Sequence, residues 1–219
     1  MLEINGFPKL TDFIELPELP DLLRSPIMVQ ISAEDAWKHG GELVRHLLGV
    51  TPLKNDKKYI SVTSQIQYLT PEFSSVRSEV KPAGDWHVDA SGLNSDDTNY
   101  LLLNGTDCNT EFNSNPLIIE QFTPETSQSE FVRFINHNNI GIQARMLEGN
   151  RIATFGCRDI HRAVNAKRPT LRFMWRVSES NSLKPVAVSK ESFGISHVFK
   201  YKTMFPNIEQ VSDGVIIYK

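Results

Sequence analysis

Three side chains in this sequence have the types and the spacing of a metal site: His87, Asp89 and His161. His87 and Asp89 lie two positions apart, and in an extended strand such residues point to the same side of the chain. An imidazole from a distant strand would complete one face of a metal ion. Two imidazoles and one carboxylate suit Fe(II), because they leave three coordination positions open for a cosubstrate and oxygen. The three residues therefore predict a facial iron site.

A basic strand is expected after the second histidine, with Arg172 placed 11 positions beyond His161. Alternation gives this strand two sides, Thr170, Arg172, Met174 and Arg176 on one and Leu171, Phe173, Trp175 and Val177 on the other. The apolar side suits a buried sheet face, and the basic side suits a polar pocket. A planar guanidinium can donate two parallel N–H bonds to a carboxylate, so Arg172, or Arg176 as the second choice, would suit a role in such a pocket.

The pattern His87-Val-Asp89, followed by His161 72 residues after the aspartate, resembles the HxD…H motif of the Fe(II)/2-oxoglutarate-dependent dioxygenase superfamily. The resemblance covers residues 59 to 178. It implies a double-stranded β-helix, Fe(II) held by these three side chains, and O2 and 2-oxoglutarate as cosubstrates. It also implies that Arg172 pairs with the far carboxylate of 2-oxoglutarate.

Other pocket residues follow from the same resemblance with less support from the motif. Thr110 lies in Asn109-Thr-Glu-Phe112, which is similar to a central-strand stretch of several subfamilies, and we expect it to line the pocket. Met174 departs from the pattern, since several subfamilies have a hydroxyl residue there. The second anchor of the far carboxylate is then expected from Tyr68, Tyr100 or Thr170. Candidates for the metal-distal end of the cosubstrate are Gln67, Arg77 and Asn104.

The activity that the resemblance implies is hydroxylation of an unactivated C–H bond in a small substrate, such as an amino acid or a metabolite. Demethylation and desaturation stay open, as does a peptidyl or nucleobase substrate. Two rival classes also stay open: a cupin-like metalloenzyme that does not use 2-oxoglutarate, and a binding module with a degenerate metal site.

The rest of the sequence predicts a mainly β domain with helices near its N-terminus. The cap pattern Ser32-Ala-Glu-Asp35 begins a helix that extends to Gly49, and a second helix is expected over 127–136. Strands are expected over 59–68, 75–80, 86–90, 99–103, 111–113, 117–122, 141–147, 151–155 and 170–177. Short strands at this density favour a jelly-roll core, with an immunoglobulin-like sandwich as the alternative. We expect a single domain with a helical lead-in (1–58), the β core (59–178) and a C-terminal extension packed on it (179–219).

The composition argues against several classes of partner and of scaffold. The formal net charge of −3 argues against broad binding to nucleic acid, and two cysteines argue against a disulfide scaffold or a thiolate zinc site. Apolar runs are only a few residues long, far short of the roughly 20 that a membrane helix needs. The expected setting is cytoplasmic, with a small-molecule substrate; the sequence gives no indication of oligomeric state.

Overall fold

The computed structural model describes residues 1–25, 28–71, 84–89 and 92–182, and the backbone of three later strands, Val186–Ala187, Ile208–Ser212 and Val215–Tyr218. The chain divides into two compact units, Met1–Leu16 with Gln67–Met174 and Pro17–Ile66 with Trp175–Lys219. The three expected metal ligands and Arg172 belong to the first unit, whereas Arg176 belongs to the second. The expected strand at 75–80, which holds Arg77, lies outside the described residues.

The first unit is built from short antiparallel strands. They are β1 (Leu2–Ile4), β2 (Lys9–Leu10), β5 (Thr98–Leu103), β6 (Glu111–Asn113), β7 (Leu117–Ile119), β8 (Ala144–Met146), β9 (Ala153–Phe155) and β10 (His161–Arg162). Two longer strands, β4 (Tyr59–Leu69) and β11 (Thr170–Ser180), each have one end in this unit. These elements confirm a mainly β chain with several antiparallel sheets and few helices among the described residues.

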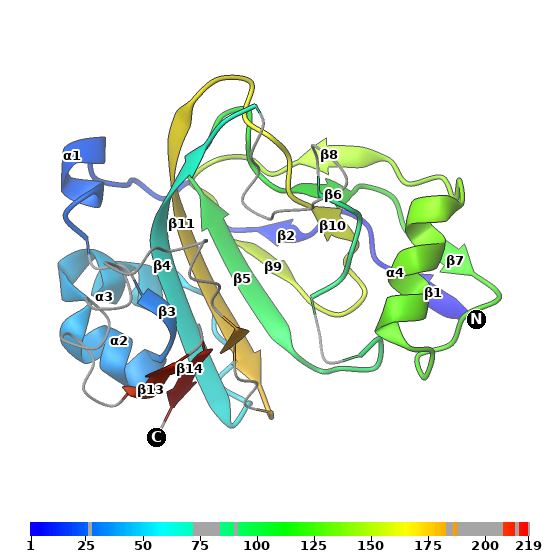
Figure 1. The fold of residues 1–219 in the computed structure, drawn as a ribbon, viewed down its shortest axis with the longest axis horizontal. Helices are drawn as coiled ribbons and strands as arrows, with labels where there is room; N and C mark the ends of the chain where they lie inside the picture. Colours follow the sequence, from blue (N-terminus) through cyan, green and yellow to red (C-terminus); the bar gives the residue numbers. More distant parts are fainter. Residues whose placement is uncertain are drawn as a thin grey trace. The chain divides into compact units, whose positions relative to one another are not determined.

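Pairing in the first unit is nested, so that early strands pair with late ones. β6 pairs with β8, β5 pairs with β9, and His87 forms an isolated antiparallel bridge with His161. β4 lies next to β11. Further contacts join β10 to β6 and β11 to β5, which gives the sheet orders β10-β6-β8 and β2-β9-β5-β11-β4. In Figure 1, β5 and β9 run side by side, and β6, β8 and β10 form a separate group.

Helix α4 (Gln128–His137) covers apolar side chains that adjoin the expected ligands. Ser127 caps it by accepting a hydrogen bond from Glu130 N at 3.3 Å, so the helix expected over 127–136 is confirmed. Its inward side chains, Phe131 and Ile135, are buried in one cluster with nearby strand residues: Leu2, Ile4, Val88, Ile119 and Ile160. Since Val88 and Ile160 flank the metal ligands in sequence, this cluster fixes the backbone on which those ligands stand.

The second unit contains α1 (Leu19–Leu22), β3 (Met28–Ser32), α2 (Ala33–His39) and α3 (Gly41–Val50) with the remaining parts of β4 and β11. Ser32 caps α2 through Asp35 N at 3.0 Å, as expected, but the single helix expected up to Gly49 is two helices. Gly41 has φ +80°, and a Cβ at Gly40 would lie 2.5 Å from Ala36 O, so this pair of glycines ends one helix and starts the next.

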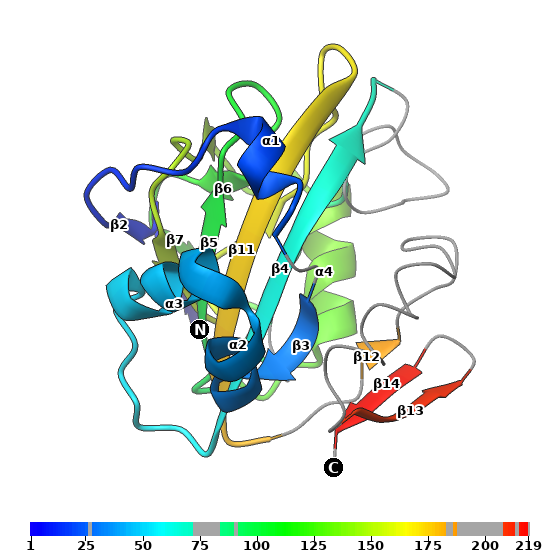
Figure 2. The same ribbon diagram turned by 90° about the vertical axis from the view of Figure 1, so that its left-hand side faces the viewer.

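Figure 2 shows α2 and α3 over one face of the parts of β4 and β11 that belong to the second unit. The Trp175 indole donates to Thr51 Oγ1 at the end of α3 (3.2 Å). The three later strands, β12 (Val186–Ala187), β13 (Ile208–Ser212) and β14 (Val215–Tyr218), form a further sheet with the order β12-β14-β13. Among the described residues, no helix is both long and apolar enough to cross a membrane.

Candidate metal centre

His87, Asp89 and His161 converge as the sequence predicted, with one potential ligand atom from each lying within 4.8 Å of the others. Asp89 Oδ2 lies 3.2 Å from His161 Nε2, and Asp89 Oδ1 lies 3.7 Å from His87 Nε2. Ligands at about 2.1 Å from a metal ion on one octahedral face are roughly 3 Å apart, so these separations fit a single ion. The donor set and its spacing therefore match a divalent transition metal.

The bridge between the two histidines sets this spacing. His87 N donates to His161 O, and His161 N donates to His87 O, each at 2.9 Å. In such a hydrogen-bonded antiparallel pair the two side chains stand side by side on one face of the sheet. The rings accordingly lie 4.4 Å apart between centroids. Two neighbouring strands thus supply two imidazoles to the same point in space.

Both imidazoles are oriented by the same local contact, which the sequence analysis missed. His87 Nδ1 lies 2.8 Å from Asp85 O, and His161 Nδ1 lies 2.9 Å from Asp159 O. A carbonyl can only accept, so each Nδ1 donates the hydrogen bond, and in a neutral imidazole of this tautomer Nε2 is the atom that can bind a metal ion. The available signal was the repeated Asp-x-His in Asp85–His87 and Asp159–His161.

The site is closed on the side of His161 and open on the side of the other two ligands. The His161 side chain is 5% exposed, whereas those of His87 and Asp89 are 29% and 25% exposed. Phe112 stacks on the His161 ring with centroids 5.0 Å apart, and Phe155 meets its edge at 5.1 Å. Within the described part of the chain, the site is therefore accessible from the side of His87 and Asp89.

Asp159 supports this arrangement from behind. Its carboxylate accepts hydrogen bonds from Gly156 N at 2.7 Å and Asn5 Nδ2 at 3.1 Å. Burial raises the pKa of this carboxyl, which is opposed by these hydrogen bonds and by nearby His161. The residue thus holds the turn that leads into β10, while its carbonyl orients His161.

Arg172 is buried rather than lining an open polar pocket, with only 2% of its surface exposed. Its Nε donates to Gln67 Oε1 at 3.0 Å, a second nitrogen donates to the same oxygen, and the third donates to Cys108 O. Burial lowers the pKa of this guanidinium to about 10. Of the five N–H donors of an arginine, two are left over, and within the described ranges no carboxylate pairs with it.

Met174 connects Arg172 with the metal ligands. The two residues share one side of β11, and Met174 packs against the apolar cluster that contains Phe112 and Phe155. Both of these rings contact His161. Gln67 Nε2 also lies 3.5 Å from the Met174 sulfur. Arg172, Gln67 and His161 therefore border one continuous set of side chains inside the first unit.

The other residues that the sequence predicted for the cosubstrate pocket lie at various depths in the structure. Tyr100 is fully buried on β5, and Thr110 is half-buried just before β6. Asn104 Oδ1 accepts from Phe173 N at 2.7 Å and so pairs with β11 instead of facing a ligand. Among the proposed second anchors, Tyr68 is 65% exposed, and Thr170 Oγ1 donates to Arg168 O at 2.9 Å.

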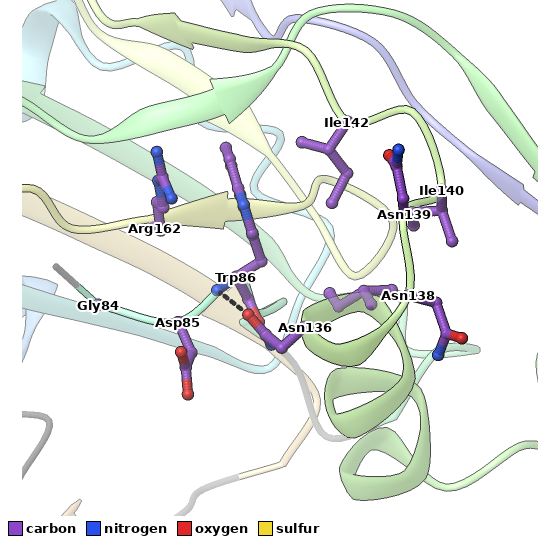
Figure 3. Close-up of a pocket in the computed structure, with 10 residues that line it drawn as sticks. Gly84, Asp85, Trp86, Asn136, Asn138, Asn139, Ile140, Ile142 and Arg162 are labelled. Carbon is purple, nitrogen blue, oxygen red and sulfur yellow. Dashed lines mark hydrogen bonds between the residues drawn. The ribbon is translucent and has the colours of Figure 1, made fainter. Parts of the chain in front are cut away.

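A cavity of about 470 Å³ lies on the opposite face of the ligand-bearing backbone. Figure 3 shows the residues that line it, among them Trp86, Asn136, Ile142 and Arg162. The Arg162 guanidinium lies 4.4 Å from the centre of the Trp86 ring and 2.8 Å from Glu111 Oε2. Because neighbouring residues of a strand point to opposite faces, Trp86 and Arg162 face this cavity while His87 and His161 face the metal centre.

Comparisons of the chain with protein-family models, with curated proteins and with solved structures give no match.

Proposed function

We propose that this protein is an Fe(II)- and 2-oxoglutarate-dependent oxygenase that hydroxylates a C–H bond of a small substrate. The observation that carries the proposal is the convergence of His87, Asp89 and His161, with the Nε2 atoms of both histidines placed beside one carboxylate. Two imidazoles and one carboxylate on a single face are the ligands expected for an oxygen-activating iron site.

The strand pairing supports a jelly-roll core for this proposed enzyme. If the His87 segment is counted with its bridge partner β10, the chain from β4 to β11 alternates between the larger and the smaller sheet, except that β6 and β8 share the smaller sheet while β7 between them pairs with β1. The first of these strands, β4, lies next to the last, β11. A long hairpin rolled on itself has this arrangement, and jelly rolls are built in that way. The metal ligands would then stand at one end of the smaller sheet and Arg172 on the larger one.

Buried Arg172 supports an anionic cosubstrate. A guanidinium that is out of water and has no carboxylate partner among the described residues is energetically unfavourable, and an anion that reaches its two spare N–H groups would relieve this. The far carboxylate of 2-oxoglutarate has the required charge and shape. Gln67, which already contacts both Arg172 and Met174, would take the place of the missing hydroxyl anchor.

Each protein group has a definite part in this reaction. Bound iron would supply the redox chemistry by which O2 and 2-oxoglutarate are converted, with the substrate, into an alcohol, succinate and carbon dioxide. Asp85 and Asp159 carbonyls keep both histidines in the tautomer that can bind metal. Phe112 and Phe155 keep water from the buried side of His161. The open side at His87 and Asp89 is where a small substrate would enter.

A second candidate is a metalloenzyme with the same core that does not use 2-oxoglutarate. It is favoured by one observation: three of the five Arg172 donors are already bonded within the protein, and Met174 occupies the hydroxyl position. The two candidates differ in whether Mn(II)-loaded protein binds 2-oxoglutarate, which calorimetry measures directly.

The activity is tested with purified protein, Fe(II), ascorbate and 2-oxoglutarate, by following succinate with and without a panel of free amino acids and related metabolites. His87→Ala should abolish succinate formation, whereas His46→Ala, at an exposed position on α3, should leave it unchanged. Absence of metal binding by the wild-type protein, or of any metal-dependent binding of 2-oxoglutarate, would remove the basis of the proposal.

A further inference from the structure

The segment that carries His87 and Asp89 is held on one edge by a strand and on the other edge by side-chain amides. His87 faces β10, where its N–H and C=O pair with His161. Trp86 and Val88 direct their backbone groups to the opposite edge, as alternation requires. No strand pairs with that edge among the described residues, so its polar groups need another partner.

Asn136 on α4 acts as a substitute for the missing strand. Its Oδ1 accepts from Trp86 N at 2.9 Å, and its Nδ2 donates to Trp86 O at 2.8 Å, across 50 positions of sequence. An asparagine amide carries the same donor and acceptor pair as a peptide group, so it can reproduce one rung of a β-ladder. Figure 3 shows this amide turned toward the Trp86 backbone.

The orientation of this amide is itself fixed. The second hydrogen of Asn136 Nδ2 is donated to Val132 O, one turn earlier in α4, at 2.8 Å. Turning the amide over would place its oxygen against two carbonyl oxygens and its NH2 group against the Trp86 N–H. The clamp therefore has one stable orientation.

Two further amides continue the support toward Asp89. Gln128, at the first residue of α4, donates to Val88 O at 2.6 Å, and Asn99 on β5 donates to Asp89 O at 3.3 Å. Gln128 and Asn136 lie on the same side of α4 as buried Phe131 and Ile135. This side of the helix therefore contacts the segment that carries His87 and Asp89 through apolar side chains in the middle and one side-chain amide at each end.

We infer that Asn136 and Gln128 are positioning residues for the metal centre, with Asn136 acting as the principal one. This inference rests on the proposed metal site. His87 and Asp89 come from the same short segment, so a shift of that segment moves two of the three ligands together relative to His161. Groups that orient metal ligands typically affect metal affinity or activity about 10- to 100-fold, although they never touch the ion.

The test is Mn(II) titration of the metal-free full-length protein by calorimetry, together with the visible spectrum of the Co(II) form at saturating metal. Asn136→Ala should weaken Mn(II) binding about 10-fold or more and change the Co(II) spectrum. The matched control is Asn138→Ala, because Asn138 Nδ2 donates only within the helix, to Phe134 O at 2.9 Å, and is exposed. It should bind Mn(II) within about twofold of wild type, even if its melting temperature falls.

Gln128→Ala provides an independent variant if Asn136→Ala does not fold, since it removes only the contact with Val88 O. It should weaken Mn(II) binding several-fold with a smaller spectral change. Wild-type affinity and an unchanged Co(II) spectrum in a folded variant would overturn the positioning role. Failure of the proposed metal site is distinguishable, because wild-type protein would then show no Mn(II) binding.

Discussion

Replacing Arg172 by methionine separates a ligand-binding arginine from a structural one. Methionine is of similar length and apolar, so it removes the buried charge while filling much of the same space. Burial lowers the pKa of this guanidinium in the folded protein to about 10, well below that of a free guanidinium, which corresponds to a cost of about 3 kcal/mol for keeping the group charged. The guanidinium of the unfolded chain keeps its proton to a higher pH than that of the folded protein. The cost in folding free energy is therefore complete below about pH 10, and it is fully present at neutral pH.

The substitution also removes the donors to Gln67 Oε1 and Cys108 O. Leaving two buried acceptors unpaired costs about 1 to 3 kcal/mol each, which offsets the relief of the charge. We therefore expect the melting temperature of the ligand-free variant to stay within about 5 °C of wild type, since 1 kcal/mol corresponds to about 2 to 4 °C for a chain of this size. An arginine in a buried ion pair would instead lose about 3 to 5 kcal/mol on truncation.

The assay is thermal unfolding of the Mn(II)-loaded protein with and without 2-oxoglutarate. Ligand at about 100 times its dissociation constant should stabilise wild type by about 2.7 kcal/mol, and Arg172→Met should lose this stabilisation. Arg176→Met is the matched control on the same strand, and should retain it. Full stabilisation of Arg172→Met by 2-oxoglutarate, or its loss in Arg176→Met instead, would refute the assignment of Arg172.

Three further predictions concern burial. Burial raises the pKa of the Cys108 and Cys157 thiols, so a disulfide reagent at pH 8 should label both far more slowly in native than in urea-unfolded protein; equal rates would contradict it. Thr51→Val should lower the free energy of unfolding in urea by about 1 to 2 kcal/mol, because the Thr51 hydroxyl accepts from Trp175 and donates to the α3 backbone. Thr51→Ser keeps this hydroxyl and should retain most of the wild-type stability. Burial also raises the pKa of the Asp159 carboxyl, so its ionised form is disfavoured in the fold. In metal-free protein, Asp159→Asn should therefore gain stability relative to wild type as pH rises from 4 to 7, and a difference independent of pH would contradict this reasoning.

Local signals predicted the elements that depend on local contacts. The start of the first helix was predicted from Ser32, which is followed three positions later by an acid, and Ser32 accepts the expected backbone hydrogen bond from Asp35 N. The second helix was predicted from apolar side chains at helical spacing over 127–136, and Ser127 caps it in the same way. The break between the two helices at Gly40 and Gly41 was missed. A glycine can lie inside a continuous helix or end it, and the backbone angle and close contacts that decide this are visible only in the structure. Strands β1 and β2 were also missed. They are only three and two residues long, and each pairs with a strand more than 100 positions away.

Alternation along β11 is confirmed on most of its apolar side, whereas the carboxylate-binding role of its basic side stays a prediction. Phe173, Trp175 and Val177 are buried as expected, but Leu171 at the start of the strand is 40% exposed. Arg172 is buried beside Met174, with which it shares a side of the strand. Period-2 alternation assigns side chains to two faces, but it cannot show that both faces are covered.

The metal centre illustrates why ligands are easier to find in a sequence than the groups that position them. His87 and Asp89 are two positions apart, so strand geometry encodes their convergence directly. Asn136 acts on Trp86 across 50 positions and Gln128 acts on Val88 across 40, through side-chain to backbone bonds that leave no spacing rule. A chain with the same three ligands but without these amides would match the motif equally well. If the amide clamp sets the separation of the ligands, such a chain would bind metal more weakly, and the motif alone could not distinguish the two.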